Sequence, residues 1–176
     1  MKKLFTMALL ASGLMASIHV KAQAEEDKSK RPSPPAKVTQ KINSGATISI
    51  DYSQPSVKGR TIGKDLEPKD GQVWRTGANE ATVFETDKNV TIDGKKLAAG
   101  KYGLFTLFSG NKVTIIFNKT WKQWGAFKYK QADDALRVDT KYTTEASPIE
   151  KMTFKISPAG EVTLLWGNRK VEFKVH

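Results

Sequence analysis

The sequence predicts an all-β fold, a single β-sandwich or jelly-roll-like domain of about nine or ten short antiparallel strands. Two observations favour this class. Apolar and polar residues alternate through most of the chain, the period of two expected of half-buried strands. Turn signals rich in Gly, Asn and Pro recur about every 8–12 residues, as in sandwiches and barrels. After the N-terminal segment no stretch keeps a helical period for long, and only residues 120–130 could hold a helical turn.

The first 22 residues are predicted to be a signal peptide. Lys2 and Lys3 precede an uncharged, largely apolar run, and small residues then permit cleavage after Ala22 or Ala24. The run is shorter than the roughly 20 residues that a spanning helix requires, which favours a cleaved signal over a membrane anchor. We therefore expect an exported protein, periplasmic in the first instance, with the extracellular medium as the alternative.

Residues 23–36 are predicted to form a disordered, Pro-rich leader, because they are polar, mixed in charge and too poor in apolar residues to bury a core. The β-sandwich domain is then expected to span residues 37–176.

The expected strands follow one another with clear turns. Residues 47–52 place Ile48, Ile50 and Tyr52 on one face, and residues 81–83 and 90–92 continue the pattern. Asp93-Gly94 predicts a tight hairpin, because such a pair accepts the positive φ angles that match strand twist. Further strands are expected at 101–108, 112–117, 135–142, 152–156, 162–166 and 171–175.

Several catalytic classes are excluded by composition. The chain has no cysteine, and its two histidines are His19, in the predicted signal peptide, and His176, the last residue. Cys–His nucleophiles, Ser-His-Asp triads and His- or Cys-based metal centres are thus not available to the mature chain. We expect no catalytic residue, no metal and no cofactor. A carboxylate pair of the glycosidase kind stays open as a third hypothesis, with candidates Asp51, Glu67, Glu80 and Glu85.

The densest mixture of polar and aromatic residues lies at 73–82 (VWRTGANEAT). Arginine is scarce here, five against 24 lysines, and its planar guanidinium can hold a carboxylate or phosphate through two parallel hydrogen bonds. We predict a pocket for a small anionic or carbohydrate-like ligand, lined by Tyr52, Arg60, Trp74, Arg75, Asn79 and Glu80. The alternative is a structural corner in which Arg75 pairs with Glu80, Trp74 joins the core and Asn79 caps the backbone.

A second candidate region is basic. With the signal region set aside, 26 basic residues stand against 18 acidic ones, and residues 94–132 carry eight lysines and no acid. This block is either a solvated face or a contact for an anionic glycan or lipid surface. Its aromatic part is either such a contact or a lid that closes the sandwich end, and export argues against nucleic acid. The candidate contact residues are Lys119, Lys122, Lys128, Lys130, Trp121 and Trp124.

Four motifs occur in order along the chain: Ser33-Pro34-Pro35-Ala36, the segment 52–60 (YSQPSVKGR), the segment 73–82, and the segment 97–102 (LAAGKY). With these motifs the chain resembles the exported bacterial family called domain of unknown function 2911, over about residues 33–173. One departure is Leu107-Phe108-Ser109-Gly110, where the family commonly has a proline. The resemblance implies an exported β domain and carries no established activity.

Ligand binding without catalysis is therefore the leading hypothesis. The alternative is an envelope structural or interaction protein that contacts anionic glycan or lipid through its lysine-rich face. The sequence does not indicate an oligomeric state.

Overall fold

The computed structural model describes residues 26–176, and the predicted signal peptide lies outside this range. The strands are β1 (Pro35–Lys41), β2 (Thr47–Ser53), β3 (Val73–Trp74), β4 (Val83–Thr86), β5 (Val90–Ile92), β6 (Lys95–Leu97), β7 (Gly100–Ser109), β8 (Lys112–Asn118), β9 (Asp134–Ile156) and β10 (Glu161–Lys174). Two short 3₁₀ helices, η1 (Lys28–Lys30) and η2 (Gln131–Asp133), complete the elements. Within this range no helix is long and apolar enough to cross a membrane. The predicted all-β class is confirmed.

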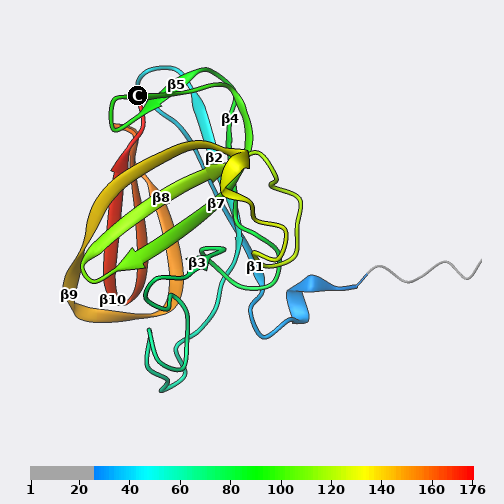
Figure 1. Cartoon of the computed structure of the whole chain (residues 1–176), viewed down its shortest axis with the longest axis vertical. Helices are drawn as coiled ribbons and strands as arrows, with labels where there is room; N and C mark the ends of the chain where they lie inside the picture. Colours follow the sequence, from blue (N-terminus) through cyan, green and yellow to red (C-terminus); the bar gives the residue numbers. More distant parts are fainter. Residues whose placement is uncertain (1–25) are drawn as a thin grey trace, which may run out of the picture.

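One curled antiparallel sheet contains most of the strands, in the order β1-β2-β4-β7-β8-β9-β10, with β3 added beside β7. In Figure 1, β7 and β8 form the front layer, and β10 with the end of β9 lies behind them. The strand β9 connects the layers: its start pairs with β8, and from Tyr142 onward it pairs with β10. The sheet therefore folds back on itself and forms a sandwich-like domain.

The fold is closed by the chain that follows β2. Ser56 forms an isolated bridge with Lys151 near the end of β9, flanked by hydrogen bonds from Val57 N to Glu150 O (2.9 Å) and from Met152 N to Pro55 O (3.0 Å). These contacts join the chain after β2 to the end of β9, which is far from β2 in the strand order of the curled sheet. They also position the chain that leads into the candidate site.

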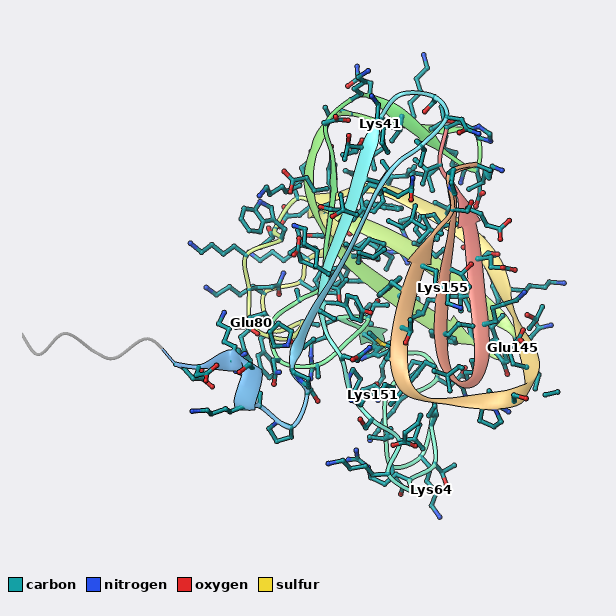
Figure 2. All side chains as sticks on the ribbon, turned by 180° about the vertical axis from the view of Figure 1, so that it is seen from behind. Lys41, Lys64, Glu80, Glu145, Lys151 and Lys155 are labelled. Carbon is teal, nitrogen blue, oxygen red and sulfur yellow. The ribbon has the colours of Figure 1, made fainter. Side chains whose placement is uncertain are left out.

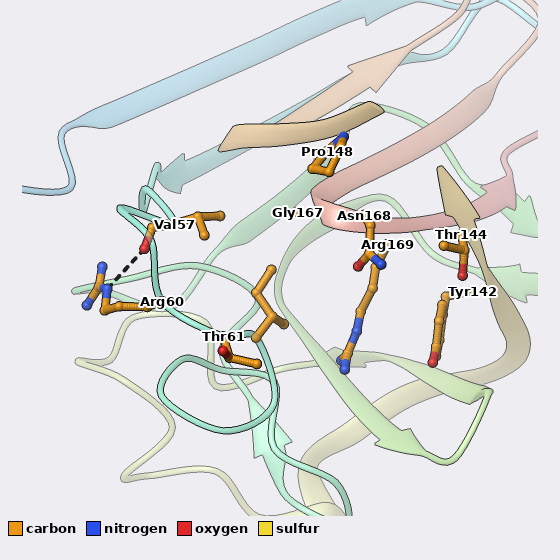
Figure 3. Close-up of a pocket in the computed structure, with 10 residues that line it drawn as sticks. Val57, Arg60, Thr61, Tyr142, Thr144, Pro148, Gly167, Asn168 and Arg169 are labelled. Carbon is orange, nitrogen blue, oxygen red and sulfur yellow. Dashed lines mark hydrogen bonds between the residues drawn. The ribbon is translucent and has the colours of Figure 1, made fainter. Parts of the chain in front are cut away.

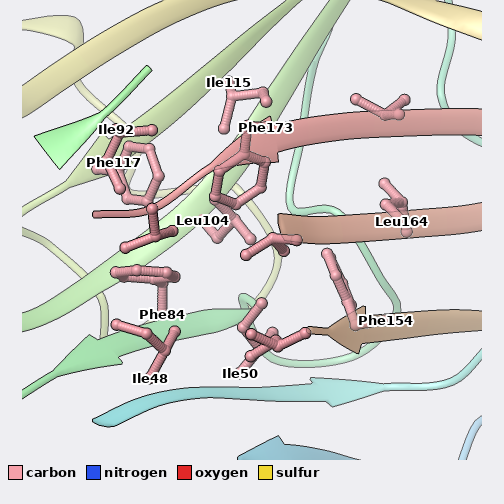
Figure 4. Packing of buried hydrophobic residues seen from close by; sticks show 14 of the residues in the cluster. Ile48, Ile50, Phe84, Ile92, Leu104, Ile115, Phe117, Phe154, Leu164 and Phe173 are labelled. Carbon is pink, nitrogen blue, oxygen red and sulfur yellow. The ribbon is translucent and has the colours of Figure 1, made fainter. Parts of the chain in front are cut away.

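The core lies between the two layers and is mostly aromatic and β-branched (Figure 4). Phe117 is fully buried and meets Phe84 and Phe173 edge to face, with ring centroids 5.0 and 5.9 Å apart. Ile48 and Ile50 of β2 are also fully buried. Because alternate residues of a strand point to the same face, the inward face expected from the sequence for β2 matches its buried residues.

Of two local predictions from the sequence, the structure confirms one and contradicts the other. Asp93 and Gly94 both have positive φ, 44° and 81°, and they join β5 to β6 as the predicted tight hairpin. In contrast, the strands expected at 162–166 and 171–175 are one strand, β10, and the two expected at 135–142 and 152–156 are one continuous strand, β9. The residues between them are mostly exposed. They lack the apolar alternation that a sequence pattern can detect, although their backbone still pairs with β10.

The part of the predicted leader that the structure describes lies against the domain. Residues 26–34 contain η1, and β1 already begins at Pro35. Arg31 forms ion pairs with Glu26 (2.6 Å) and Glu80 (2.8 Å), and Lys28 also pairs with Glu80 (2.9 Å). The attachment consists of polar contacts, so the shortage of apolar residues in the leader gives no indication of it.

Candidate functional site

A rigid corner follows β3. Thr76 and Asn79 both have positive φ, 53° and 56°, a conformation that costs energy for residues other than glycine. Side-chain hydrogen bonds offset this cost: Thr76 Oγ1 lies 3.1 Å from Thr106 Oγ1, and Thr82 Oγ1 donates to Thr76 O over 2.7 Å. The backbone at residues 75–79 is thus fixed by buried threonines of the corner and of β7.

Trp74 and Gly77 form the inner wall of this corner. Trp74 is only 3% exposed, and its Nε1 donates to Gly77 O over 3.0 Å. A Cβ on Gly77 would lie 2.9 Å from Thr82 Oγ1 and 3.1 Å from Ser53 O, closer than ordinary contacts allow. Glycine is required there because the β2 backbone passes directly beside it. The structure therefore places Trp74 in the core, as the structural alternative expected.

Arg75 is the unusual residue of the corner. Its Nε is buried and has no hydrogen-bond partner, and within residues 26–176 its guanidinium forms no ion pair. Burial lowers the pKa of Arg75, and the carboxylate of Glu67 opposes that shift only in part. An arginine still keeps its proton at neutral pH. The site therefore holds a positive charge that the carboxylate of Glu67 offsets only in part.

A pocket of about 200 Å³ adjoins Arg75. Arg60 and Arg75 provide positive charge and Glu67 adds one carboxylate. Trp74 and Trp166 provide aromatic surface, and Leu66 lies among the remaining lining residues. Trp166 is held by a hydrogen bond from its Nε1 to Glu67 O, 2.7 Å long. The composition matches that of small-molecule sites, which are largely apolar with a few placed polar groups.

A second pocket, of about 410 Å³, shares Arg60 with the first. Figure 3 shows Arg60 on one side of it and Arg169, with Tyr142, on the other. The Arg60 guanidinium is positioned by two backbone acceptors, Val57 O at 3.1 Å from Nε and Ser56 O at 2.8 Å from Nη2. The Arg169 guanidinium lies 5.4 Å from the Phe108 ring and 5.2 Å from the Tyr142 ring. Both cations are thus oriented without a carboxylate partner.

The five arginines divide into two groups. Arg31 and Arg137 form ion pairs with carboxylates. Arg60, Arg75 and Arg169 form none within the described residues, and these three line the two adjoining pockets. Since arginine is scarce in this chain, the grouping of the unpaired ones at adjoining pockets marks this region as the candidate site.

The six residues predicted to line one pocket are not brought together: five lie in two separate hollows, and Asn79 lines neither of them. Arg60, Trp74 and Arg75 line the pocket described above, whereas Tyr52 and Glu80 line a separate hollow of about 180 Å³. Tyr52 is buried, and its hydroxyl accepts a hydrogen bond from Phe154 N. Asn79 donates to Ser33 O over 2.9 Å and so anchors the leader.

Glu80 does not pair with Arg75. The structural alternative predicts that pair, so this part of it is not observed. Its carboxylate accepts from Lys28 and Arg31. Partial burial would raise the pKa of Glu80, but these hydrogen bonds outweigh burial and lower the pKa below its ordinary 4.5. A glycosidase general acid needs a raised pKa, so Glu80 has the opposite electrostatics to that role. Among residues 26–176 no cluster of three or more His, Cys, Asp or Glu side chains could hold a metal.

The candidate contact residues of the basic block lie in the loop between β8 and η2. Lys119, Lys122, Lys128 and Lys130 are exposed. Trp124 is 53% exposed, whereas Trp121 is half-buried, with Lys101 Nζ 5.6 Å from its ring centroid. No helix forms at 120–130, but residues 125–128 make a hydrogen-bonded turn in which Tyr129 N donates to Ala126 O over 3.1 Å. The side chain of Gln123 bonds the loop internally, accepting from Lys128 N and donating to Thr120 O.

The family model described as Protein of unknown function (DUF2911) matches residues 33–175. The chain belongs to the DUF2911 family. This match confirms the resemblance found in the sequence motifs. Comparisons with curated proteins and with solved structures found no match. Membership of the DUF2911 family therefore assigns no ligand, and the site must be interpreted from its own residues.

Two site residues were missed by sequence reasoning, Arg169 and Trp166. Trp166 follows the apolar alternation of its strand, a pattern that indicates only a core position. Arg169 had a usable signal, since it is one of only five arginines. Its sequence distance from Arg60 and Arg75 concealed the grouping.

Proposed function

We propose that this protein binds a small anionic ligand, with a carboxylate or phosphate group seated against Arg75 and Arg60. The observation that carries the proposal is that the buried Nε of Arg75 has no hydrogen-bond partner. A partly buried charge is costly when its counter-charge compensates it only in part, as Glu67 does for Arg75. An anion in the adjoining pocket would offset that cost. The electrostatic free energy of Arg75 would then be lower with the anion bound than without it, and this gain contributes to affinity.

The pocket sizes indicate the kind of ligand. The Arg75 pocket, about 200 Å³, is smaller than the roughly 300–1,000 Å³ of sites for drug-sized molecules. It suits one anionic group with a short apolar attachment that contacts Trp74 and Trp166. The adjoining pocket, about 410 Å³, falls within that range. A ligand that extends past Arg60 could therefore place its polar remainder, such as a sugar ring or a second anion, against Arg169 and Tyr142.

Export fits this proposal. The predicted signal peptide would place the domain in the periplasm, with the extracellular medium as the alternative, where free organic acids and acidic sugars are plausible ligands. A binding role also agrees with the lack of Cys and His chemistry in the mature sequence.

Thermal unfolding of the mature protein with a panel of inorganic phosphate, short organic acids, sugar acids and nucleotides tests the proposal. A ligand at 100 times its Kd should raise the free energy of unfolding by about 2.7 kcal/mol. Arg75→Gln should abolish that increase, because glutamine cannot provide the bidentate charged contact. The control is Arg137→Gln, which removes an ion-paired arginine outside both pockets. The proposal is overturned if no anion stabilises the wild type, or if Arg75→Gln responds as the control does.

A further inference from the structure

The loop of residues 119–130, here called the aromatic loop, has a fixed backbone. Ala81 N donates to Gln123 O and Gly125 N donates to Asn79 O, both over 3.0 Å, so the loop pairs with the corner that follows β3. At its far end the side chain of Asn118 donates to Lys130 O over 3.0 Å. In Figure 1 the loop, drawn in yellow-green, stands out at the edge of the molecule near η1. The exposure of its side chains is thus built into an ordered segment.

Two aromatic side chains are presented at the tip of this loop. Phe127 is 85% exposed and Trp124 is 53% exposed, and they are the exposed large hydrophobic residues of the described chain. Arg31 lies 5.6 Å from the Trp124 ring centroid and covers part of it. Between them Gly125 has a φ of +60°, and the Phe127 ring lies against it. An ordered loop that keeps a phenylalanine in water forgoes the burial that normally stabilises such a side chain, so a partner is to be expected.

Four exposed lysines surround the aromatic pair, namely Lys119, Lys122, Lys128 and Lys130. None of them forms an ion pair within residues 26–176. Elsewhere in the same basic block, Lys101 pairs with Glu85 and Lys112 pairs with Asp139. The acidic groups beside the loop are already engaged: Asp133 accepts from Thr120, Asp134 binds Arg137, and Glu80 binds Lys28 and Arg31. The cations at the loop therefore remain available to an external anion.

We propose that the aromatic loop docks the protein on an anionic lipid bilayer, with Phe127 and Trp124 inserted at the interface and the lysines among the phosphate headgroups. Tryptophan and other amphipathic aromatic groups favour the headgroup region, and lysines gain from the negative potential of an anionic leaflet. Exposed aromatic rings and lysine ammonium groups on one loop match a broad, fluid, negatively charged surface. The site does not depend on the arginine pockets, so the ligand proposal and this one can fail separately.

Flotation of the full mature protein with vesicles tests the docking surface. We expect binding to phosphatidylcholine vesicles that contain phosphatidylglycerol, weak binding to phosphatidylcholine alone, and loss of binding at high salt. Phe127→Ala should lower the partition coefficient about tenfold, because the phenylalanine side chain that would enter the membrane interface is removed. The triple variant Lys119→Glu, Lys122→Glu, Lys128→Glu should weaken it about a hundredfold or more.

A matched triple variant provides the control. Lys41→Glu, Lys64→Glu and Lys155→Glu change the net charge equally, at exposed lysines that Figure 2 shows widely separated and away from Glu80, which adjoins the loop. This control should keep most of the vesicle binding. An equal loss of vesicle binding in both triple variants would show that net charge alone causes it, and would overturn the proposal. Equal binding to neutral and anionic vesicles would also overturn it.

Depth of insertion offers an independent readout. Brominated lipids should quench tryptophan fluorescence in the wild type, and Trp124→Phe should remove most of that quenching. If Phe127→Ala instead abolishes binding to single-stranded nucleic acid, or dissociates a dimer, without changing flotation, the loop serves that partner and the bilayer proposal is wrong.

Discussion

The molecule presents positive charge in two different ways. At the pockets, Arg60 is held by two backbone carbonyl groups and Arg169 by two aromatic rings, and both border cavities. On the aromatic loop, the lysines are exposed and form no side-chain hydrogen bond or ion pair within the described residues. A fixed guanidinium selects an anion by geometry, whereas a flexible ammonium responds mainly to charge. The described chain therefore places its unpaired arginines in fixed positions beside cavities and the lysines of the aromatic loop in solvent.

Two tryptophans give the largest expected difference between the regions. Trp74→Ala should lower the free energy of unfolding by about 3–5 kcal/mol, because it empties a buried aromatic position and removes the hydrogen bond to Gly77 O. Trp124→Ala should cost less than about 1 kcal/mol, because that ring is half exposed. Urea unfolding of both variants measures the difference. Similar costs would show that the aromatic loop is a structural lid of the domain.

Removing one cation from each region should give a smaller difference in the free energy of unfolding. Here the variant at the pocket is expected to be the more stable one. Arg75→Met should raise the free energy of unfolding of the ligand-free protein by about 1 kcal/mol, because it removes a buried donor that has no acceptor. Lys128→Met should change it by less than about 0.5 kcal/mol, as surface substitutions usually do. Thermal unfolding without added anions provides the measurement. If Arg75→Met destabilises the protein, Arg75 has a structural role that the pocket does not reveal.

The smallest expected effect lies at the boundary of the two regions, where Glu80 joins the leader, the corner and the loop. Its folded-state pKa is depressed below 4.5, so its contribution to stability is complete above that pH and is lost as pH falls through the folded-state value. The carboxylate is 39% exposed, and screening should keep the contribution below about 1 kcal/mol.

Unfolding measured from neutral pH down to below pH 4.5 should show this loss in the wild type and not in Glu80→Gln. An NMR titration of the Glu80 carboxyl carbon reports the same pKa directly. A midpoint at or above 4.5, or an unchanged pH profile in Glu80→Gln, would show that Lys28 and Arg31 do not hold the leader through this carboxylate.

Much of the fold was predictable because its determinants are local. The alternation of Ile48, Ile50 and Tyr52 specifies the buried face of a strand, and Asp93-Gly94 specifies a hairpin. The continuity of β9 was not predictable in this way. Its middle residues carry no apolar alternation, and they remain in a strand only because β10 provides hydrogen-bond partners.

By itself, the sequence determined the all-β class, the family and the scarcity of arginine in a lysine-rich chain. Only the tertiary structure decided which arginines are paired. Glu80 is five residues from Arg75, yet it binds Lys28 and Arg31 from the leader, and Arg75 instead adjoins Arg60 at a pocket. The physical reason is that strand faces follow from neighbouring residues, whereas charge pairing depends on which distant segments the curled sheet brings into contact.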